Sequence, residues 1–178
     1  FKRTTMEGRS SYSLTAVGLI FATPALGGFL FGYDISSTSY AVLQFGFHSA
    51  ALQGLVVSSP SLGAFLGSVF IFRLSDWLGR RAELRIGAVL YMVGASLEVL
   101  SGAAILPDWL FVGLLLIGRT VYGFGIAFAM HGGPTYISEM APSEMRGLLV
   151  SLKEAAIVAG ILSGYVLGNA FSKTCGGW

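Results

Sequence analysis

Long uncharged stretches, separated by short charged clusters, dominate the chain. One stretch runs from Ser10 to Tyr33, and another, from Ile35 to Phe72, is too long for a single helix. Because a membrane-crossing helix needs about 20 mostly apolar residues, the pattern predicts five spans. These are expected at about residues 14–40, 52–72, 84–106, 109–137 and 148–170.

Helices are the form of backbone that these stretches favour. An open strand leaves its backbone polar groups unpaired in lipid, and the stretches lack the alternation of barrel strands. The sequence therefore predicts an all-α integral membrane protein with about five transmembrane helices. The polar clusters Arg73–Arg81 and Ser138–Gly147 are expected to be loops, as is Gln44–His48, and Pro107-Asp108 is expected to be a turn.

Composition agrees with a membrane protein and excludes several other classes. The chain is 54% hydrophobic and 11% charged, whereas soluble domains carry about 25% charged residues. Its mean hydropathy of +0.73 excludes disorder. A net charge of +2 without a basic patch gives no support to nucleic-acid binding. The single cysteine, Cys175, cannot form an intrachain disulfide. Because the chain starts at Phe1 and stops at Trp178, we expect it to be an excerpt of a longer protein.

The distribution of basic residues predicts an orientation. Nine of the eleven fall at the N-terminus or at the connections after the second and fourth spans. They are Lys2, Arg3, Arg9, Arg73, Arg80, Arg81, Arg85, Arg146 and Lys153. Basic residues accumulate on the cytosolic side of membrane proteins, so the N-terminus is expected in the cytosol. This orientation is compatible with the plasma membrane and with a vacuolar or plastid membrane.

Three acids and one arginine within the predicted spans are candidates for a functional role, because charge inside a membrane is costly and usually functional. They are Asp34, Glu98, Arg119 and Glu154. In a purely structural interpretation, Arg119 pairs with Asp34 or Glu98, and Glu154 extends toward the surface beside Lys153. In the functional interpretation, a titratable acid faces Arg119 and forms a proton-coupling pair, because a proton on the acid competes directly with the ion pair.

Four motifs in order resemble those of the sugar porters in the major facilitator superfamily. They are Gly27–Asp34, Asp76–Arg81, Gly118-Arg119 with Gly123–Gly125, and Pro134–Glu139 with Pro142–Gly147. The resemblance extends over the whole chain. Within the family, the chain resembles plant vacuolar or plastid hexose transporters and bacterial xylose–proton symporters. It implies the N-terminal half of a major facilitator fold, whose C-terminal half would be the missing partner.

The resemblance also implies roles for individual residues. Asp34 and Arg119 match the proton-coupling pair. The implied sugar contacts are Phe31, Glu154, Ile157 and Ile161. The implied cytosolic gate of salt bridges comprises Asp76, Arg80, Glu139 and Arg146. Three positions depart from the family pattern: Phe72 replaces a glycine, Glu154 replaces a glutamine, and Glu98 has no recognised counterpart.

The implied function is proton-coupled symport of a hexose or pentose by alternating access. Its partners would be the sugar, the proton and the lipid bilayer, and the proton gradient would supply energy without a cofactor. A non-transporting fragment or regulatory relative is the alternative, and a facilitative sugar uniporter is a further one.

Two stretches imitate enzyme motifs but lack the required context. Gly113–Thr120 matches a phosphate-binding loop except for an arginine in place of lysine, yet it lies in a predicted helix. His131–Pro134 resembles a lipase oxyanion stretch, but no G-x-S-x-G motif accompanies it. Two histidines and one cysteine give no metal-ligand spacing. We therefore expect neither an enzyme nor a metal site. The series Ala156, Gly160, Gly164 and Gly168 favours close helix contact inside the protein over dimerisation.

Overall fold

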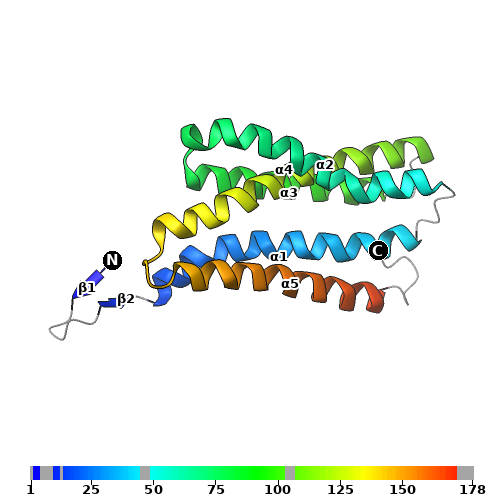
Figure 1. The fold of residues 1–178 in the computed structure, drawn as a ribbon. Coiled ribbons are helices and arrows are strands. Elements are labelled where there is room, and N and C mark those ends of the chain that lie inside the picture. The colour runs from blue at the N-terminus through cyan, green and yellow to red at the C-terminus, as the bar shows by residue number, and fades with distance from the viewer. Residues whose placement is uncertain (1, 5–9, 13, 45–48, 103–106, 172–178) are drawn as a thin grey trace.

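The computed structural model describes residues 2–4, 10–12, 14–44, 49–102 and 107–171. These residues form a short hairpin and five long helices (Figure 1). The elements are β1 (Lys2–Thr4), β2 (Ser10–Tyr12), α1 (Leu14–Gln44), α2 (Ala50–Leu78), α3 (Arg80–Ser101), α4 (Asp108–Met140) and α5 (Arg146–Phe171). The prediction of a five-helix membrane protein is confirmed, since all five helices are long and apolar enough to cross a membrane.

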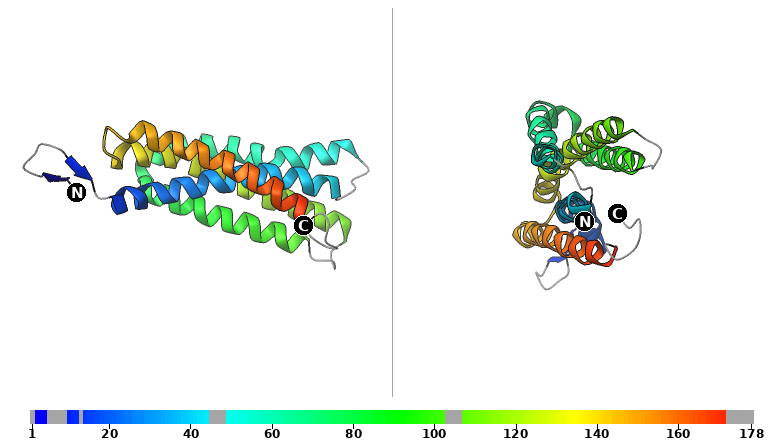
Figure 2. Two further views of the ribbon diagram at one scale, coloured as in Figure 1. Left: turned by 90° about the horizontal axis from the view of Figure 1, so that it is seen from below. Right: turned by 90° about the vertical axis from the view of Figure 1, so that its right-hand side faces the viewer.

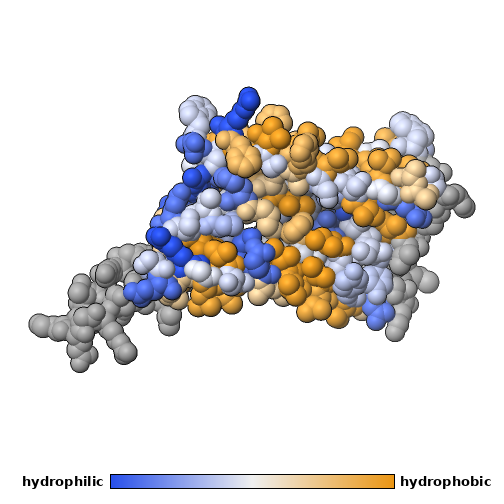
Figure 3. All heavy atoms as spheres, in the orientation of Figure 1, coloured by the Kyte–Doolittle hydropathy of each residue, from blue (hydrophilic) through white to orange (hydrophobic). Residues whose placement is uncertain are grey.

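The helices run back and forth along one common direction. Figure 1 shows the hairpin, the α2–α3 junction and the α4–α5 junction at the same end of the bundle. The space-filling view in Figure 3 shows hydrophilic surface gathered at that end and hydrophobic surface along the sides. The three regions that hold most of the basic residues therefore lie together.

The polar cluster between the second and third spans is more helical than the sequence analysis predicted. Helix α2 continues through Arg73 to Leu78, and α3 begins at Arg80, so Gly79 alone separates them. Gly79 has φ of 75°, a left-handed conformation that glycine adopts without steric cost. A helix of 29 residues is about 44 Å long at 1.5 Å per residue, which exceeds the roughly 30 Å of a bilayer core. The helix is therefore long enough for its charged end to lie beyond the lipid while it remains helical.

Other boundaries differ in the same way. Helix α4 continues to Met140 and α5 begins at Arg146, which shortens the expected loop at Ser138–Gly147. Helix α3 ends at Ser101, and residues 103–106 of the predicted third span lie outside the described residues, as do 45–48 of the expected first loop. The hairpin was not predicted: β1 pairs with β2 antiparallel, with Lys2 opposite Tyr12.

Helix α4 is the centre of the packing. It contacts α2, α3 and α1, whereas α5 packs mainly along α1, as the end-on view in Figure 2 illustrates. The α1–α5 contact brings backbone against backbone. A Cβ atom at Gly32 would overlap the Ile157 carbonyl oxygen, and one at Gly160 would overlap that of Phe29. The glycine series on α5 therefore serves an internal contact, as the sequence analysis favoured.

The buried side chains form small clusters between helices. One cluster, near the hairpin end of α1, consists of Val17, Ile137, Ala141 and Leu149. Another joins α3 to α4 and consists of Tyr91, Tyr122, Ile126 and Ala129. Many large apolar side chains are exposed on the bundle instead, among them Leu19, Phe65 and Val99. Such an outer surface suits lipid or another helical unit.

Candidate functional site

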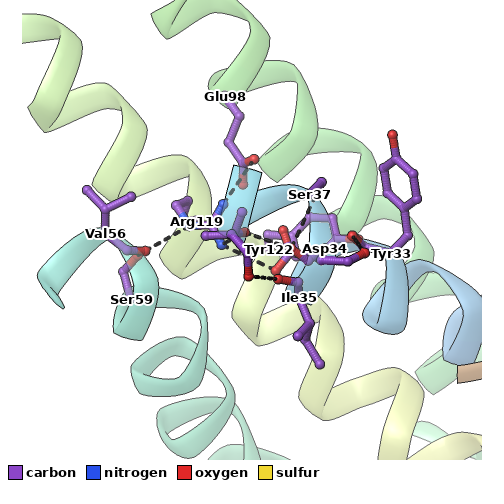
Figure 4. A network of polar contacts seen from close by, with 12 residues as sticks. Tyr33, Asp34, Ile35, Ser37, Val56, Ser59, Glu98, Arg119 and Tyr122 are labelled. Carbon is purple, nitrogen blue, oxygen red and sulfur yellow. Dashed lines mark hydrogen bonds and ion pairs between the residues drawn. The ribbon is translucent and has the colours of Figure 1, made fainter. Parts of the chain in front are cut away.

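Arg119 lies buried in α4 and makes polar contacts with three other helices (Figure 4). Its Nη2 atom donates to Asp34 Oδ2 at 3.3 Å and to Thr38 Oγ1 at 2.6 Å, both on α1. Its Nε atom donates to the Val56 carbonyl oxygen of α2 at 2.9 Å. The side chain is 7% exposed. A guanidinium carries five donors in a fixed plane, and here that plane connects separate helices.

The Val56 carbonyl oxygen can accept hydrogen bonds from side chains because a proline follows it in α2. Pro60 lies four residues further along α2 and has no backbone N–H, so the usual helical donor to Val56 is missing. Ser59 Oγ and Arg119 Nε both donate to this oxygen, each at 2.9 Å. A carbonyl oxygen offers two lone pairs, and both are used.

Asp34 and Thr38 lie one helical turn apart on α1 and act together on Arg119. Thr38 Oγ1 donates to the Asp34 carbonyl oxygen at 2.7 Å, and this bond orients its lone pairs toward the arginine. The Asp34 side chain is 10% exposed. The structure thus brings together the predicted pair, Asp34 and Arg119, and adds Thr38, which the sequence analysis missed.

Glu98 is a second carboxylate at the same arginine. Its Oε2 atom lies 3.7 Å from Arg119 Nη1. Its Oε1 atom is buried and has no hydrogen-bond partner among the described residues. Glycine makes this approach possible: a Cβ atom at Gly118 would lie 3.1 Å from both Glu98 Cγ and the Glu98 backbone nitrogen. The open choice between Asp34 and Glu98 as partners of Arg119 is resolved, because both acids contact it.

A pocket of about 310 Å³ lies beside the two carboxylates. The polar side chains in its lining come from α1, α3 and α4: Tyr33, Asp34, Ser37, Tyr91, Glu98 and Tyr122. The rings of Tyr91 and Tyr122 pack edge to face with centroids 4.6 Å apart. Tyr122 Oη donates to the Leu30 carbonyl oxygen at 3.1 Å, which ties α4 to α1.

The four implied sugar contacts are not among the residues that line this pocket. Phe31 packs against the Tyr91–Tyr122 cluster. Ile157 and Ile161 are half-buried on α5, and the Ile157 backbone lies against Gly32 of α1. Glu154 is exposed on α5 and pairs with the buried Lys153 at 2.8 Å, as the structural interpretation of this pair expected. The role of these four residues in sugar binding stays a prediction.

The implied gate contains one salt bridge in this structure. Arg80 Nε lies 2.8 Å from Glu139 Oε1 and joins the start of α3 to the end of α4. Arg146 Nε instead donates to the Ala141 carbonyl oxygen at 3.0 Å. Asp76 is exposed, and it has no salt bridge within 4.0 Å to another residue that the structure describes.

A buried acidic group near the gate was missed by the sequence analysis. Glu83 is fully buried, and its Oε1 atom lies 2.5 Å from His131 Nδ1 on α4. Ser75 Oγ donates to Glu83 Oε2 at 3.3 Å, and Arg80 also donates to Ser75. Glu83 lies in the first turn of α3, shortly after the polar cluster Arg73–Arg81, and no local sequence pattern marked it as buried.

These contacts hold a charge network that a proton can alter. Two carboxylates share one guanidinium inside a span, so adding a proton to either acid removes one ion pair. No group of three His, Cys, Asp or Glu side chains in the described part of the chain is placed to hold a metal ion. The stretch Gly113–Thr120 is helical within α4, so it does not form a loop of backbone donors around a phosphate.

Comparison with known sequences identifies relatives. The sequence model of the family described as "Sugar (and other) transporter" matches residues 20–178. The chain is 48% identical to "D-xylose-proton symporter-like 3, chloroplastic" of Arabidopsis thaliana, over 97% of this chain and 31% of that protein. It is 38% identical to the D-xylose transporter of Levilactobacillus brevis, over 92% and 35%. It is 36% identical to the galactose-proton symporter of Escherichia coli K12, over 97% and 35%. The chain therefore spans about a third of the length of these relatives.

Solved structures show the same helix arrangement. The partially occluded, inward-open xylose transporter XylE from E. coli superposes with a TM-score of 0.79 at 28% identity, over 90% of this chain and 42% of that one. XylE bound to 6-bromo-6-deoxy-D-glucose also superposes with a TM-score of 0.79, over 92% and 39%.

Proposed function

The chain belongs to the sugar transporter family, with the major facilitator fold that its motifs predicted, and on this premise we propose that it forms the N-terminal part of a proton-coupled sugar symporter. Major facilitators consist of two six-helix halves with the substrate held between them near the bilayer midplane. The five helices described here supply one side of such a site. The partner they require is the C-terminal half of the carrier.

The contact between Asp34 and Arg119 carries this proposal. The two side chains form a buried ion pair that joins α1 to α4. A proton on Asp34 removes the negative charge that holds Arg119, whereas the arginine keeps its own proton throughout. Proton binding therefore loosens α1 from α4 and permits closure around a bound sugar. The inward-directed proton gradient supplies the energy, and no cofactor takes part.

The sugar would be a hexose or pentose held between the halves. Glu154 is exposed on α5 and Ile157 and Ile161 are half-buried there, so this helix offers an outer face to the second half. We assign these residues and Phe31 to the sugar contacts. A carboxylate at position 154 accepts hydrogen bonds from sugar hydroxyls. The Arg80–Glu139 bridge, with Asp76 and Arg146 nearby in sequence, would hold the cytosolic gate closed.

The N-terminus is placed in the cytosol under this proposal. The hairpin and the α2–α3 and α4–α5 junctions share one end of the bundle (Figure 1), and basic residues favour the cytosolic side. Because five helices separate the two termini, tags at residues 1 and 178 should face opposite sides of sealed vesicles, so added protease should remove one tag and leave the other. Removal of both tags, or protection of both, would exclude this topology.

The proposal is tested by Asp34→Asn in the complete carrier. The amide keeps the shape of the side chain but cannot take up the proton, so accumulation of sugar driven by a pH gradient should be lost. Sugar binding and exchange at equal concentrations should persist. The control is Glu144→Gln, an exposed residue in the α4–α5 connection, which should accumulate sugar normally. If Asp34→Asn still accumulates sugar with the gradient, the coupling assignment is wrong. If neither parent nor variant responds to the gradient while both equilibrate sugar, the protein is a facilitative uniporter. A carrier that shows no saturable uptake would be a non-transporting relative.

A further inference from the structure

We infer that Glu98 is the second proton-binding carboxylate of this site and takes over Arg119 when Asp34 is protonated. The inference rests on the proposed function and extends it to a residue on a third helix. Asp34 Oδ2 lies 3.3 Å from Nη2 of Arg119, and Glu98 Oε2 lies 3.7 Å from Nη1. The two acids therefore contact different nitrogens of one guanidinium, as Figure 4 shows. Either acid can hold Arg119 while the other is neutral.

The placement of Glu98 is built into the packing of α3 against α4. Gly118 directly precedes Arg119, and its missing side chain leaves room for Glu98 Cγ. One turn before Glu98, Gly94 lies against the backbone of Tyr122, where a Cβ atom would be 2.7 Å from the Tyr122 nitrogen. Two close approaches thus bring this part of α3 onto the helix that carries the arginine.

The charges of the site favour one bound proton. With both acids ionised and Arg119 protonated, the three groups sum to one negative charge, and a single proton makes the site neutral. A site with Asp34 alone would be neutral without the proton and positive with it. Net charge inside the bilayer is unfavourable, so the second carboxylate makes proton uptake easier.

Among the described residues that line the adjoining pocket, none besides Asp34 and Glu98 carries a charge near pH 7. The other titratable groups around Glu98 and Asp34 are the hydroxyls of Tyr33 on α1, Tyr91 on α3 and Tyr122 on α4, and tyrosine is neutral near pH 7. Helix α2 contributes the Val56 carbonyl and the Ser59 hydroxyl, which are also neutral. The balance of charge is therefore decided by Asp34, Glu98 and Arg119.

The arrangement gives the proton two positions. In one state it lies on Glu98, whose buried Oε1 atom has no hydrogen-bond partner among the described residues, and Asp34 holds Arg119. In the other state the Glu98 carboxyl has lost the proton, the Asp34 carboxylate has gained it, and Glu98 holds Arg119. The ion pair between Asp34 on α1 and Arg119 is then lost, although the total charge of the site is unchanged. The adjoining pocket of about 310 Å³ borders both carboxylates and offers room for water between them.

The test measures sugar accumulation by the complete carrier as a function of external pH. In Glu98→Gln, proton binding to Asp34 leaves Arg119 without an anionic partner, so the pH of half-maximal accumulation should fall by about one unit or more, equivalent to a tenfold higher proton concentration. Glu98→Asp keeps a carboxylate, so its pH of half-maximal accumulation should lie closer to that of the parent. Glu144→Gln should match the parent. Exchange of sugar at equal concentrations verifies that each variant is folded.

Gly118→Ala gives a second route to the same result, because the added methyl group displaces Glu98 without removing its charge. It should shift the profile toward acid pH as Glu98→Gln does. An unchanged pH profile in Glu98→Gln, with exchange intact, would overturn the role of Glu98 and leave the symporter proposal standing. Accumulation that persists in Asp34→Asn would instead contradict the assignment of Asp34 as the coupling acid in the proposed function, so the two failures are distinguishable.

Discussion

Arg119 Nε donates a hydrogen bond of 2.9 Å to the carbonyl oxygen of Val56, on a helix that carries neither acid of the site. Pro60 leaves that oxygen without its helical donor. The arginine is consequently anchored to α2 whichever carboxylate it contacts. Proton binding can then change its contact with α1 without freeing the guanidinium.

This anchor predicts the effect of Pro60→Ala in the complete carrier. Alanine restores a backbone N–H aimed at the Val56 oxygen, whose two lone pairs already accept from Ser59 and Arg119. A third donor must displace one of them, so we expect proton-driven sugar uptake to fall several-fold. Ser59→Ala combined with Pro60→Ala frees one lone pair and should recover uptake. Full activity of the single variant would show that the anchor is dispensable.

The contact between α1 and α5 predicts a selective effect of an added methyl group. A Cβ atom at Gly160 would overlap the carbonyl oxygen of Phe29, whereas nothing lies within 4 Å of a Cβ atom at Gly113 in α4. We expect Gly160→Ala to cost about 1–3 kcal/mol of stability, because overpacking here meets backbone. Gly113→Ala should be neutral or stabilise by about 1 kcal/mol, since alanine favours helix. Thermal unfolding in detergent micelles compares the two, and equal unfolding temperatures would contradict the packing argument.

The sequence was sufficient to predict the five helices, because lipid demands long apolar segments with internally bonded backbone. It also predicted that Arg119 pairs with Asp34 or Glu98, since buried opposite charges need partners, and the family resemblance singled out Asp34. Helix ends were harder to predict, because charged residues such as Arg73 continue a helix beyond the lipid as readily as they form a loop. The hairpin gave no recognisable signal.

The remaining members of the site depend on tertiary contacts. Thr38 contacts Arg119 through its hydroxyl group, one helical turn after Asp34. Val56 contacts Arg119 through a carbonyl oxygen that Pro60 leaves without its helical donor. Neither residue carries a charge that would mark it in the sequence. Pro60, in an otherwise helical stretch, was the available signal for the open carbonyl. The burial of Glu83 depends on the approach of α4, which no local pattern reveals.

The Glu83–His131 contact predicts a stability effect at the hairpin end of the bundle. Glu83 is fully buried and accepts from Ser75, while its other oxygen contacts His131. In Glu83→Gln one oxygen becomes an amide nitrogen that cannot accept, so a buried donor loses its partner at a cost of about 1–3 kcal/mol. Glu144→Gln, the same change at an exposed position, should leave the unfolding temperature unchanged. If both variants unfold like the parent, the buried contact does not contribute to stability.

The Arg80–Glu139 bridge predicts a conformational effect with little effect on stability. Their side chains are 26% and 50% exposed, and exposed pairs contribute about 0–1 kcal/mol. A bias of about 1 kcal/mol nevertheless changes the ratio of two transporter states roughly fivefold. Charge exchange is a poor test, because Arg80→Glu would place a carboxylate beside Glu83, now 3.9 Å from Arg80.

A double-mutant cycle of Arg80→Gln and Glu139→Gln avoids that conflict. We expect each single variant of the complete carrier to increase the inward-open population severalfold, and the double variant to add little, because the bridge is already absent after one change. Distances between spin labels on the cytosolic ends of the two halves report the populations. Unfolding temperatures serve as the control and should change little for Glu139→Gln, whose side chain is half exposed. Additive population shifts in the double variant would mean that Arg80 acts through Ser75 and Glu83, and that its bridge to Glu139 does not set the gate.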